Sequence, residues 1–260
     1  MGVKSNLAFL SALYRRELAS ALEYRFNFVV QTVGMVLNDA FWLLFWLIFF
    51  EKFGSVNGWQ FKEIIMLNSV LAGSWGLTVV LFGNWKDIAK FIENGSLDYY
   101  LTLPKNVLLH LLVKMHYSGM GDLVYGLGLS FFVVQKSQIL LFVLLFLSAS
   151  LTILGFGILI GSITFYLRYF EQMARTAREV FLTFSFYPFS IYSGFTRFFL
   201  LFIIPAGFVG GIPVELLTSF SWKWFILQIA VSLFFFIFSI WFFYHGLKRY
   251  ESGNVIAMKG

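Results

Sequence analysis

The chain has 260 residues, of which 59% are hydrophobic and only 12% are charged, and its formal net charge is +6. Soluble domains carry about a quarter charged residues, and a water-soluble fold of this length could not hide so much apolar surface. The composition therefore excludes an ordinary soluble domain and predicts an integral membrane protein. The absence of cysteine excludes disulfides, thiol catalysis and thiolate metal sites.

The first predicted element, residues 1–25, is an amphipathic helix. Its apolar side chains recur at three- and four-residue steps, at Leu7, Leu10, Tyr14, Leu18 and Leu22. The opposite face carries Arg15, Arg16, Ser20 and Glu23. This pattern is typical of a helix that lies in the membrane interface, and a solvated helix packed on another domain is the alternative. Because the charges at Arg15 and Arg16 interrupt any apolar core, we expect no cleavable signal peptide.

Six apolar segments of 15 to 30 residues follow, and a spanning helix needs about 20. They are Phe26–Phe50, Ile64–Gly83, Met115–Val134, Gln138–Leu167, Val180–Gly194 and Trp224–Leu247. Pro188 interrupts the fifth of them. The expected fold is thus an all-α membrane protein with six transmembrane helices in a single domain, 1–260.

A further apolar stretch, residues 198–217, lies before the last segment and is broken by Pro205, Gly207, Gly210, Gly211 and Pro213. Broken helices at membrane depth persist only where protein or a water-filled cavity satisfies their backbone. We therefore expect a re-entrant hairpin here.

The basic residues favour one topology. Six spans with both termini in the cytoplasm leave only five of the 19 basic residues outside, namely Lys52, Lys62, Lys136, Arg197 and Lys223. This is the bias of the positive-inside rule. It explains the positive net charge without nucleic acid, and no nucleic-acid partner is expected.

The segment between the second and third spans, Asn84 to Pro104, reads NWKDIAKFIENGSLDYYLTLP. Asn84 is placed to cap a short helix and Gly95 to end it. Trp85, Ile88 and Ile92 share one face, and charged side chains occupy the others. The segment predicts a cytoplasmic helix over Trp85–Asn94 with apolar and charged groups, as a docking element has; a solvated loop helix is the alternative.

Within this segment, G-S-L-D-Y-Y-L-x-x-P from Gly95 to Pro104 resembles the signature that follows the second span in permease subunits of the type 2 ABC (ABC-2) exporter family. The N-terminal amphipathic helix, the broken stretch before the last span, and the ending G-L-K-R-Y-E-S-G from Gly246 to Gly253 resemble the same family. The resemblance extends over essentially the whole chain.

The resemblance implies a six-helix permease that docks a separate ATP-binding cassette ATPase through a coupling helix and turn at residues 84–98. It implies two ATPase copies, a second identical or homologous permease, the bacterial inner membrane, and ATP and Mg²⁺ bound by the partner. The implied docking residues are Trp85, Lys86, Asp87, Ile88, Lys90, Phe91, Glu93, Gly95, Leu97 and Asp98. The chain has no G-x-x-x-x-G-K-[ST] phosphate-binding loop, so no cofactor and no enzyme activity are expected in it.

Two carboxylates interrupt expected spans, Asp39 in the first and Asp122 in the third, and intramembrane ionisable groups are functional candidates. Asp122 stands in G-M-G-D, which is similar to the G-x-G-D of intramembrane aspartyl proteases. The second span lacks the partner aspartate of those proteases, however. A hydrogen-bonded structural role against Asn38, His116, Tyr117 or a facing helix, and a place along a transport path, remain open.

Aromatic side chains beside Pro188, above all Tyr187 and Tyr192, are the other candidates for a transport path, because a kinked helix exposes specific side chains. No histidine or acidic cluster has metal-ligand spacing. The sequence thus predicts a permease that moves a hydrophobic or amphipathic solute, lipid or glycan outward. The alternatives are an intramembrane aspartyl hydrolase using Asp39 and Asp122, and a proton-coupled secondary transporter.

Overall fold

The computed structural model describes residues 3–103 and 106–250, and these residues form an all-helical bundle. Their one extended pairing is an isolated bridge between Val56 and Trp59, in the loop after the first long helix. This helical bundle confirms the predicted fold class, an all-α membrane protein. Residues 1–2, 104–105 and 251–260, which include Pro104 and Glu251–Gly253 of the motifs above, lie outside the described residues.

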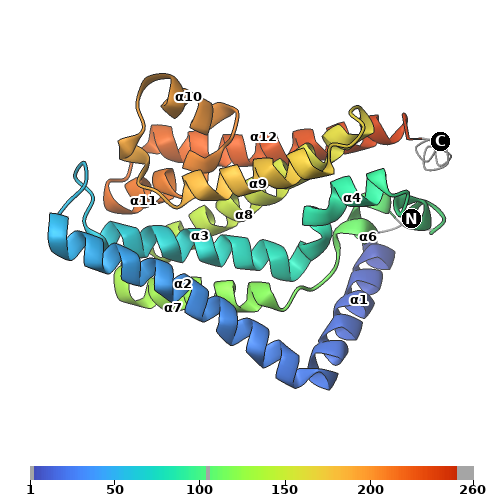
Figure 1. Ribbon diagram of the computed structural model, residues 1–260, viewed down its shortest axis with the longest axis horizontal. Helices are drawn as coiled ribbons and strands as arrows, with labels where there is room; N and C mark the ends of the chain where they lie inside the picture. Colours follow the sequence, from blue (N-terminus) through green and yellow to red (C-terminus); the bar gives the residue numbers. More distant parts are fainter. Residues whose placement is uncertain (1–2, 104–105, 251–260) are drawn as a thin grey trace.

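The chain begins with α1 (Val3–Glu23), which confirms the predicted N-terminal helix. At Tyr24 the chain turns sharply into α2 (Arg25–Phe53), so that the two helices form a V (Figure 1). The arm formed by α1 runs across one end of the bundle, whereas α2 runs along its side. The break at Tyr24 therefore separates the amphipathic segment from the first apolar one.

Four helical runs are long and apolar enough to cross a membrane. They are α2; Phe61–Glu93, made of α3 (Phe61–Phe82), η1 (Gly83–Asp87) and α4 (Ile88–Glu93); Lys136–Phe165, made of η2 (Lys136–Gln138), α8 (Ile139–Ser162) and η3 (Ile163–Phe165); and α12 (Trp222–Leu247). They correspond to the first, second, fourth and sixth expected segments. The third is a shorter apolar helix, α7 (Ser118–Val133).

The fifth expected segment, Val180–Gly194, has different bounds in the structure. Helix α9 (Glu171–Ser185) begins earlier, in a charged stretch, and ends before Pro188; it is followed by η4 (Phe189–Ile191). Proline disfavours helical conformation in the residue before it, which explains the end of the helix. Helix α9 has only 15 residues and carries charges in its first two turns, so it is not among the helices that could cross a membrane by length and composition.

The Pro/Gly-rich stretch forms three short helical pieces, α10 (Gly194–Phe202), η5 (Ala206–Phe208) and α11 (Gly211–Thr218). Pro205 and Gly210 lie at the two breaks. Most of η5 and α11 is buried, and Figure 1 shows these pieces gathered beside the start of α12. Protein contacts thus cover the backbone at η5 and α11.

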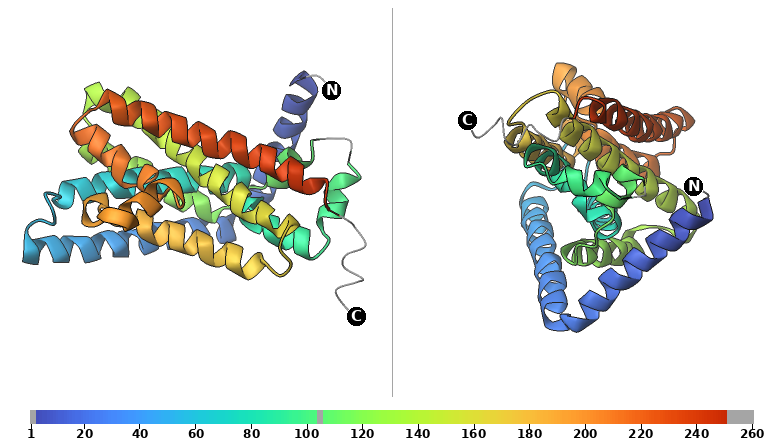
Figure 2. Two further views of the ribbon diagram at one scale, coloured as in Figure 1. Left: turned by 90° about the horizontal axis from the view of Figure 1, so that it is seen from above. Right: turned by 90° about the vertical axis from the view of Figure 1, so that its right-hand side faces the viewer.

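Helix α3 lies at the centre of the bundle, with α2 and α12 on its outer sides (Figure 2). Glycines let α3 and α7 approach closely: a Cβ on Gly76 or on Gly126 would overlap the backbone of the other helix. Hydrogen bonds add to the packing, such as Ser69 Oγ to the Gly126 carbonyl at 2.7 Å and, between α8 and α12, Thr152 Oγ1 to Ser232 Oγ at 2.9 Å. Small residues and polar contacts of this kind hold helices together in a membrane.

Candidate functional site

One end of the bundle gathers α4, the short helices α5 (Leu97–Leu101) and α6 (Val107–Leu112), and both described ends of the chain (Figure 1). We call it the α4 end. The predicted docking segment lies here, and it is a continuation of α3 through the 3₁₀ turn η1. The segment is thus joined directly to the most deeply buried membrane helix.

Buried side chains anchor this segment to α8. Trp85 is 1% exposed and Ile88 is fully buried. A Cβ on Gly157 would overlap the Trp85 ring, and a Cβ on Gly161 would crowd Ile88. The two glycines of α8 therefore form notches into which the segment packs, with Trp75 of α3 meeting Trp85 edge to face at 5.2 Å.

Two hydrogen bonds fix the start of the segment. The backbone N–H of Gly83 donates to the Lys114 carbonyl at 2.8 Å, and the Asn84 side-chain amide donates to the Leu111 carbonyl at 2.9 Å. Asn84 was expected to cap the following helix, and this expectation is wrong: the amide satisfies a carbonyl at the end of α6 instead. A side-chain amide can donate as well as accept, and the buried carbonyl needed a donor.

The end of α4 follows the sequence prediction. Gly95 has a φ of +77°, the left-handed conformation that ends helices and that glycine adopts without steric cost. The Ser96 N–H then donates to Asn94 Oδ1 at 3.0 Å, and α5 begins at Leu97. A tight turn thus separates the two short helices.

The predicted docking residues divide into three groups by exposure. Trp85, Ile88 and Leu97 are buried in the bundle and anchor the segment to it. Lys90 is exposed. The rest are half-buried: Lys86, Asp87, Phe91, Glu93, Gly95 and Asp98.

Sequence reasoning missed two exposed side chains of this surface. Tyr99 is 64% exposed and Leu101 is 41% exposed, although both belong to the quoted L-D-Y-Y-L motif. An exposed aromatic beside an exposed leucine is typical of a protein contact. The adjacent tyrosines Tyr99 and Tyr100 could have revealed this surface, because only one of two neighbouring side chains on a short helix can face inward.

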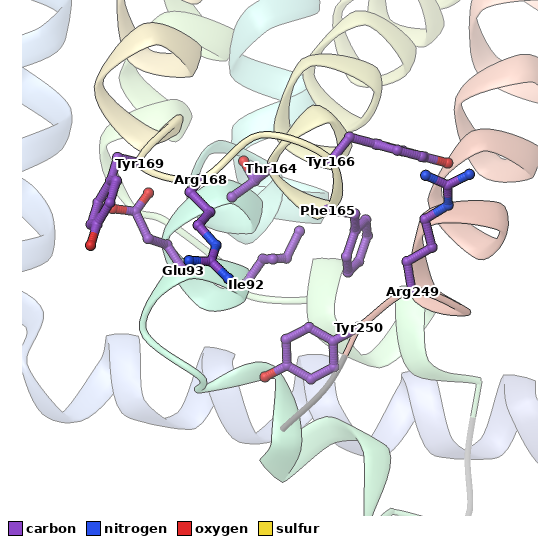
Figure 3. Close-up of a pocket in the computed structure, with 9 residues that line it drawn as sticks. All are labelled: Ile92, Glu93, Thr164, Phe165, Tyr166, Arg168, Tyr169, Arg249 and Tyr250. Carbon is purple, nitrogen blue, oxygen red and sulfur yellow. The ribbon is translucent and has the colours of Figure 1, made fainter. Parts of the chain in front are cut away.

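A cavity of about 140 Å³ opens beside α4, between the η3 turn and the end of α12 (Figure 3). Arg168 and Arg249 line it, and the Arg249 guanidinium lies 4.9 Å from the Tyr166 ring centre. Glu93 also lines it, but its Oε2 accepts the Glu171 N–H at 3.0 Å and so caps the start of α9. With Lys90, the α4 end therefore presents exposed positive charge.

Helix α1 and the end of α12 both meet this region. The Tyr14 hydroxyl donates to the Leu81 carbonyl at 2.5 Å, and burial raises the pKa of Tyr14 to about 12. At the other side, burial and the nearby Asp98 carboxylate raise the pKa of Tyr250 above its usual value. Three of the quoted sequence motifs thus converge on one end of the molecule.

The structure brings Asp39 and Asp122 together, between α2 and α7. Asp39 is 7% exposed and Asp122 is 3% exposed, and their carboxyl groups lie within hydrogen-bonding reach of each other. Of the structural partners considered for them, Asn38 lies close enough to influence the Asp39 carboxyl group, and from the facing helix α7 the Tyr125 hydroxyl donates to the Asp39 backbone carbonyl at 3.2 Å. His116 and Tyr117 do not contact them through any hydrogen bond between described residues.

These carboxylates line a cavity of about 290 Å³, whose other lining residues come from α2, α3 and the end of α9. Tyr187 and Tyr192 are not among its lining residues: Tyr187 packs on Trp46 and Tyr192 on Phe184. The four residues expected on a transport path are therefore not brought to one cavity. No group of three or more potential metal ligands occurs within residues 3–103 and 106–250.

A bundle of apolar helices with this composition defines the class of the protein: a multi-pass helical membrane protein. Residues 36–254 match the family model described as ABC-2 family transporter protein. The chain belongs to this family, which confirms the resemblance and makes it the membrane component of a transporter. No curated protein and no solved structure gives a significant match.

Proposed function

We propose that this chain is the permease subunit of an ATP-driven exporter and that the α4 end docks a separate ATPase subunit. The observation that carries the proposal is the division of the α4–α5 segment into buried and exposed faces. Trp85 and Ile88 fasten it to α8, while Lys90, Tyr99 and Leu101 are exposed. A partner that moves this segment therefore moves membrane helices with it.

The exposed charge indicates what the partner presents. Lys90, Arg168 and Arg249 are all exposed at this end, so an ATPase groove with acidic side chains complements it. Helix α1 forms the second contact, because it lies against the end of α3 through Tyr14. ATP and Mg²⁺ are bound by the partner.

The assembly we propose contains two such ATPase copies and two permeases, identical or homologous, in the bacterial inner membrane with both termini cytoplasmic. It moves a hydrophobic or amphipathic solute, lipid or glycan outward. The exposed apolar residues of α2, which buries only Asp39, Trp46 and Phe50, give the second permease and the lipid an apolar surface. The broken α10–α11 stretch is the proposed re-entrant hairpin.

The docking proposal is tested by a paired substitution, Lys90→Glu with Tyr99→Ser. It removes one exposed cation and one exposed aromatic without touching the buried anchors. We expect the affinity for the partner ATPase to fall about tenfold or more, which is about 1.4 kcal/mol, and transport-linked ATPase stimulation to fall with it. Co-purification and ATPase assays measure the two effects.

The matched control is Lys62→Glu with Phe220→Ser, which changes one exposed lysine and one exposed phenylalanine outside the α4 end. We expect this variant to bind and stimulate the ATPase like the unchanged chain. Both variants are compared at equal amounts of membrane-inserted protein. Undiminished ATPase binding by the Lys90/Tyr99 variant would reject the α4 end as the docking surface.

A further inference from the structure

The cavity between α2, α3, α7 and α9 is lined by both acidic and apolar side chains. The carboxyl groups of Asp39 and Asp122 line it. The rest of the lining is mostly apolar and includes three aromatic side chains, which we call the aromatic wall: Trp42 of α2 stacks on Phe186 at 5.8 Å with an interplanar angle of 12°, and Trp75 of α3 lines the same space. Its volume of about 290 Å³ is close to the lower end for small-molecule sites.

One oxygen of each carboxyl group has no hydrogen-bond partner in the described part of the chain. Asp39 Oδ2 and Asp122 Oδ1 are buried without a hydrogen-bond donor from the described part of the chain. No lysine or arginine of that part makes an ion pair with either; Lys86, the cation whose charge reaches Asp122, does not contact it. Buried carboxylates are costly unless a proton or a cation neutralises them.

A proton shared by the two carboxyl groups would meet the electrostatic need, as it does in other carboxyl pairs. It does not account for an open cavity with an aromatic wall. Aromatic faces attract organic cations, because the ring quadrupole is negative over the face. A carboxylate pair that shares a cavity with tryptophan and phenylalanine rings therefore matches one ligand class, a cation with apolar substituents.

We propose that this cavity binds an amphipathic organic cation, with the charged centre at Asp39 and Asp122 and the apolar groups against Trp42, Trp75 and Phe186. This names the substrate class of the proposed exporter and rests on that function. Trp42 is 40% exposed, so the cavity opens at the surface of α2, where a membrane-dissolved ligand can enter. Trp75 also touches Trp85, so the cavity and the anchor of the docking segment share a side chain.

The test measures saturable binding of radiolabelled tetraphenylphosphonium to the full chain in lipid nanodiscs, with empty nanodiscs subtracted. The Asp39→Asn/Asp122→Asn variant keeps the shape of both side chains and removes both negative charges. We expect its affinity to be at least tenfold lower, and Glu51→Gln, at the exposed end of α2, to leave affinity unchanged. Radiolabelled tetraphenylborate, of the same shape and opposite charge and assayed by itself, is expected not to bind saturably.

A second pair of variants tests the aromatic wall. Trp42→Leu is expected to weaken tetraphenylphosphonium binding by roughly 3- to 30-fold, the range of a cation–π contact. Trp222→Leu, a matched change at an exposed tryptophan of α12 away from the cavity, is expected to have no effect. Equal affinity of the unchanged chain and both cavity variants for tetraphenylphosphonium, or saturable binding of tetraphenylborate with similar affinity, would overturn the proposal.

These measurements use the chain without an ATPase, so their outcome is separate from that of the docking test. Binding by the Lys90→Glu/Tyr99→Ser variant is expected to equal that of the unchanged chain. If tetraphenylphosphonium does not bind while ATPase docking persists, the cation inference is wrong and the permease function stands. If tetraphenylphosphonium binds as expected while the Lys90→Glu/Tyr99→Ser variant still binds the ATPase undiminished, the cation site stands and the α4 end is rejected as the docking surface.

Discussion

The ring of Trp85 lies where a side chain on Gly157 would have to be, so each residue determines what the other position can hold. Trp85 was expected to contact the ATPase, yet it is almost fully buried. Its neighbour Lys90, in the same short segment, is exposed. At the residue scale, the proposed function therefore assigns anchoring and docking to different side chains of one segment.

The anchor can be tested at Gly157. A valine there would push on the Trp85 ring and its surroundings, and overpacking of this kind costs about 1–3 kcal/mol. We expect Gly157→Val to lower the apparent melting temperature in detergent by roughly 2 to 10 °C and to weaken ATPase stimulation. Gly128→Val is the control, because no atom lies within 4 Å of a Cβ built at Gly128. Equal melting temperatures for the two variants would contradict the contact.

The element that matters most is the run from α3 through η1 to α4. It is continuous as a helix but changes to a 3₁₀ turn at Gly83–Asp87, where the chain leaves the membrane helix. A 3₁₀ stretch inside a helix often marks a hinge. The tight turn at Gly95 then sets the direction of α5, and with it the position of Tyr99.

We expect Gly95→Ala to uncouple the transporter while leaving the bundle folded. Alanine in the left-handed conformation costs about 1 kcal/mol, so the turn shifts and Tyr99 moves with it. Gly54→Ala is the control: it has a similar φ of +73° but lies in the loop between α2 and α3. Transport and ATPase stimulation measure coupling, and similar losses in both variants would show that strain alone, not the α4–α5 turn, is responsible.

At the scale of the whole molecule, the helices differ in how much of their surface is buried. Helix α3 is surrounded, whereas α2 and α12 present many exposed apolar side chains, among them Phe41 and Phe45 on α2 and Phe234 and Trp241 on α12. Such surfaces are stable only against lipid or another apolar chain. The described ends of the chain lie at the same end of this bundle as α4 (Figure 2).

The proposed orientation can be tested by labelling, since the chain has no cysteine of its own. Ser96→Cys lies at the α4 end and Ser55→Cys in the α2–α3 loop, and both serines are exposed. A membrane-impermeant maleimide is expected to label Ser55→Cys in intact cells and Ser96→Cys only in inside-out vesicles. Labelling of Ser96→Cys from outside would place the docking segment on the wrong side for an ATPase.

The sequence by itself determined what depends on neighbouring residues. Apolar runs of about 20 residues located most of the long helices, Gly95 marked the end of α4, and the periodicity of the first 25 residues identified α1. The short motifs also led to the correct family. These features follow from local backbone preferences and from the length that a bilayer requires.

Only the tertiary structure decided which side chains are buried, exposed or paired. That Trp85 is an anchor depends on Gly157 of α8, and that Asp39 meets Asp122 depends on how α2 packs on α7. Asn84 bonds α6 rather than capping its own helix for the same reason. Contacts between segments distant in the chain determine these outcomes, and no local pattern carries that information.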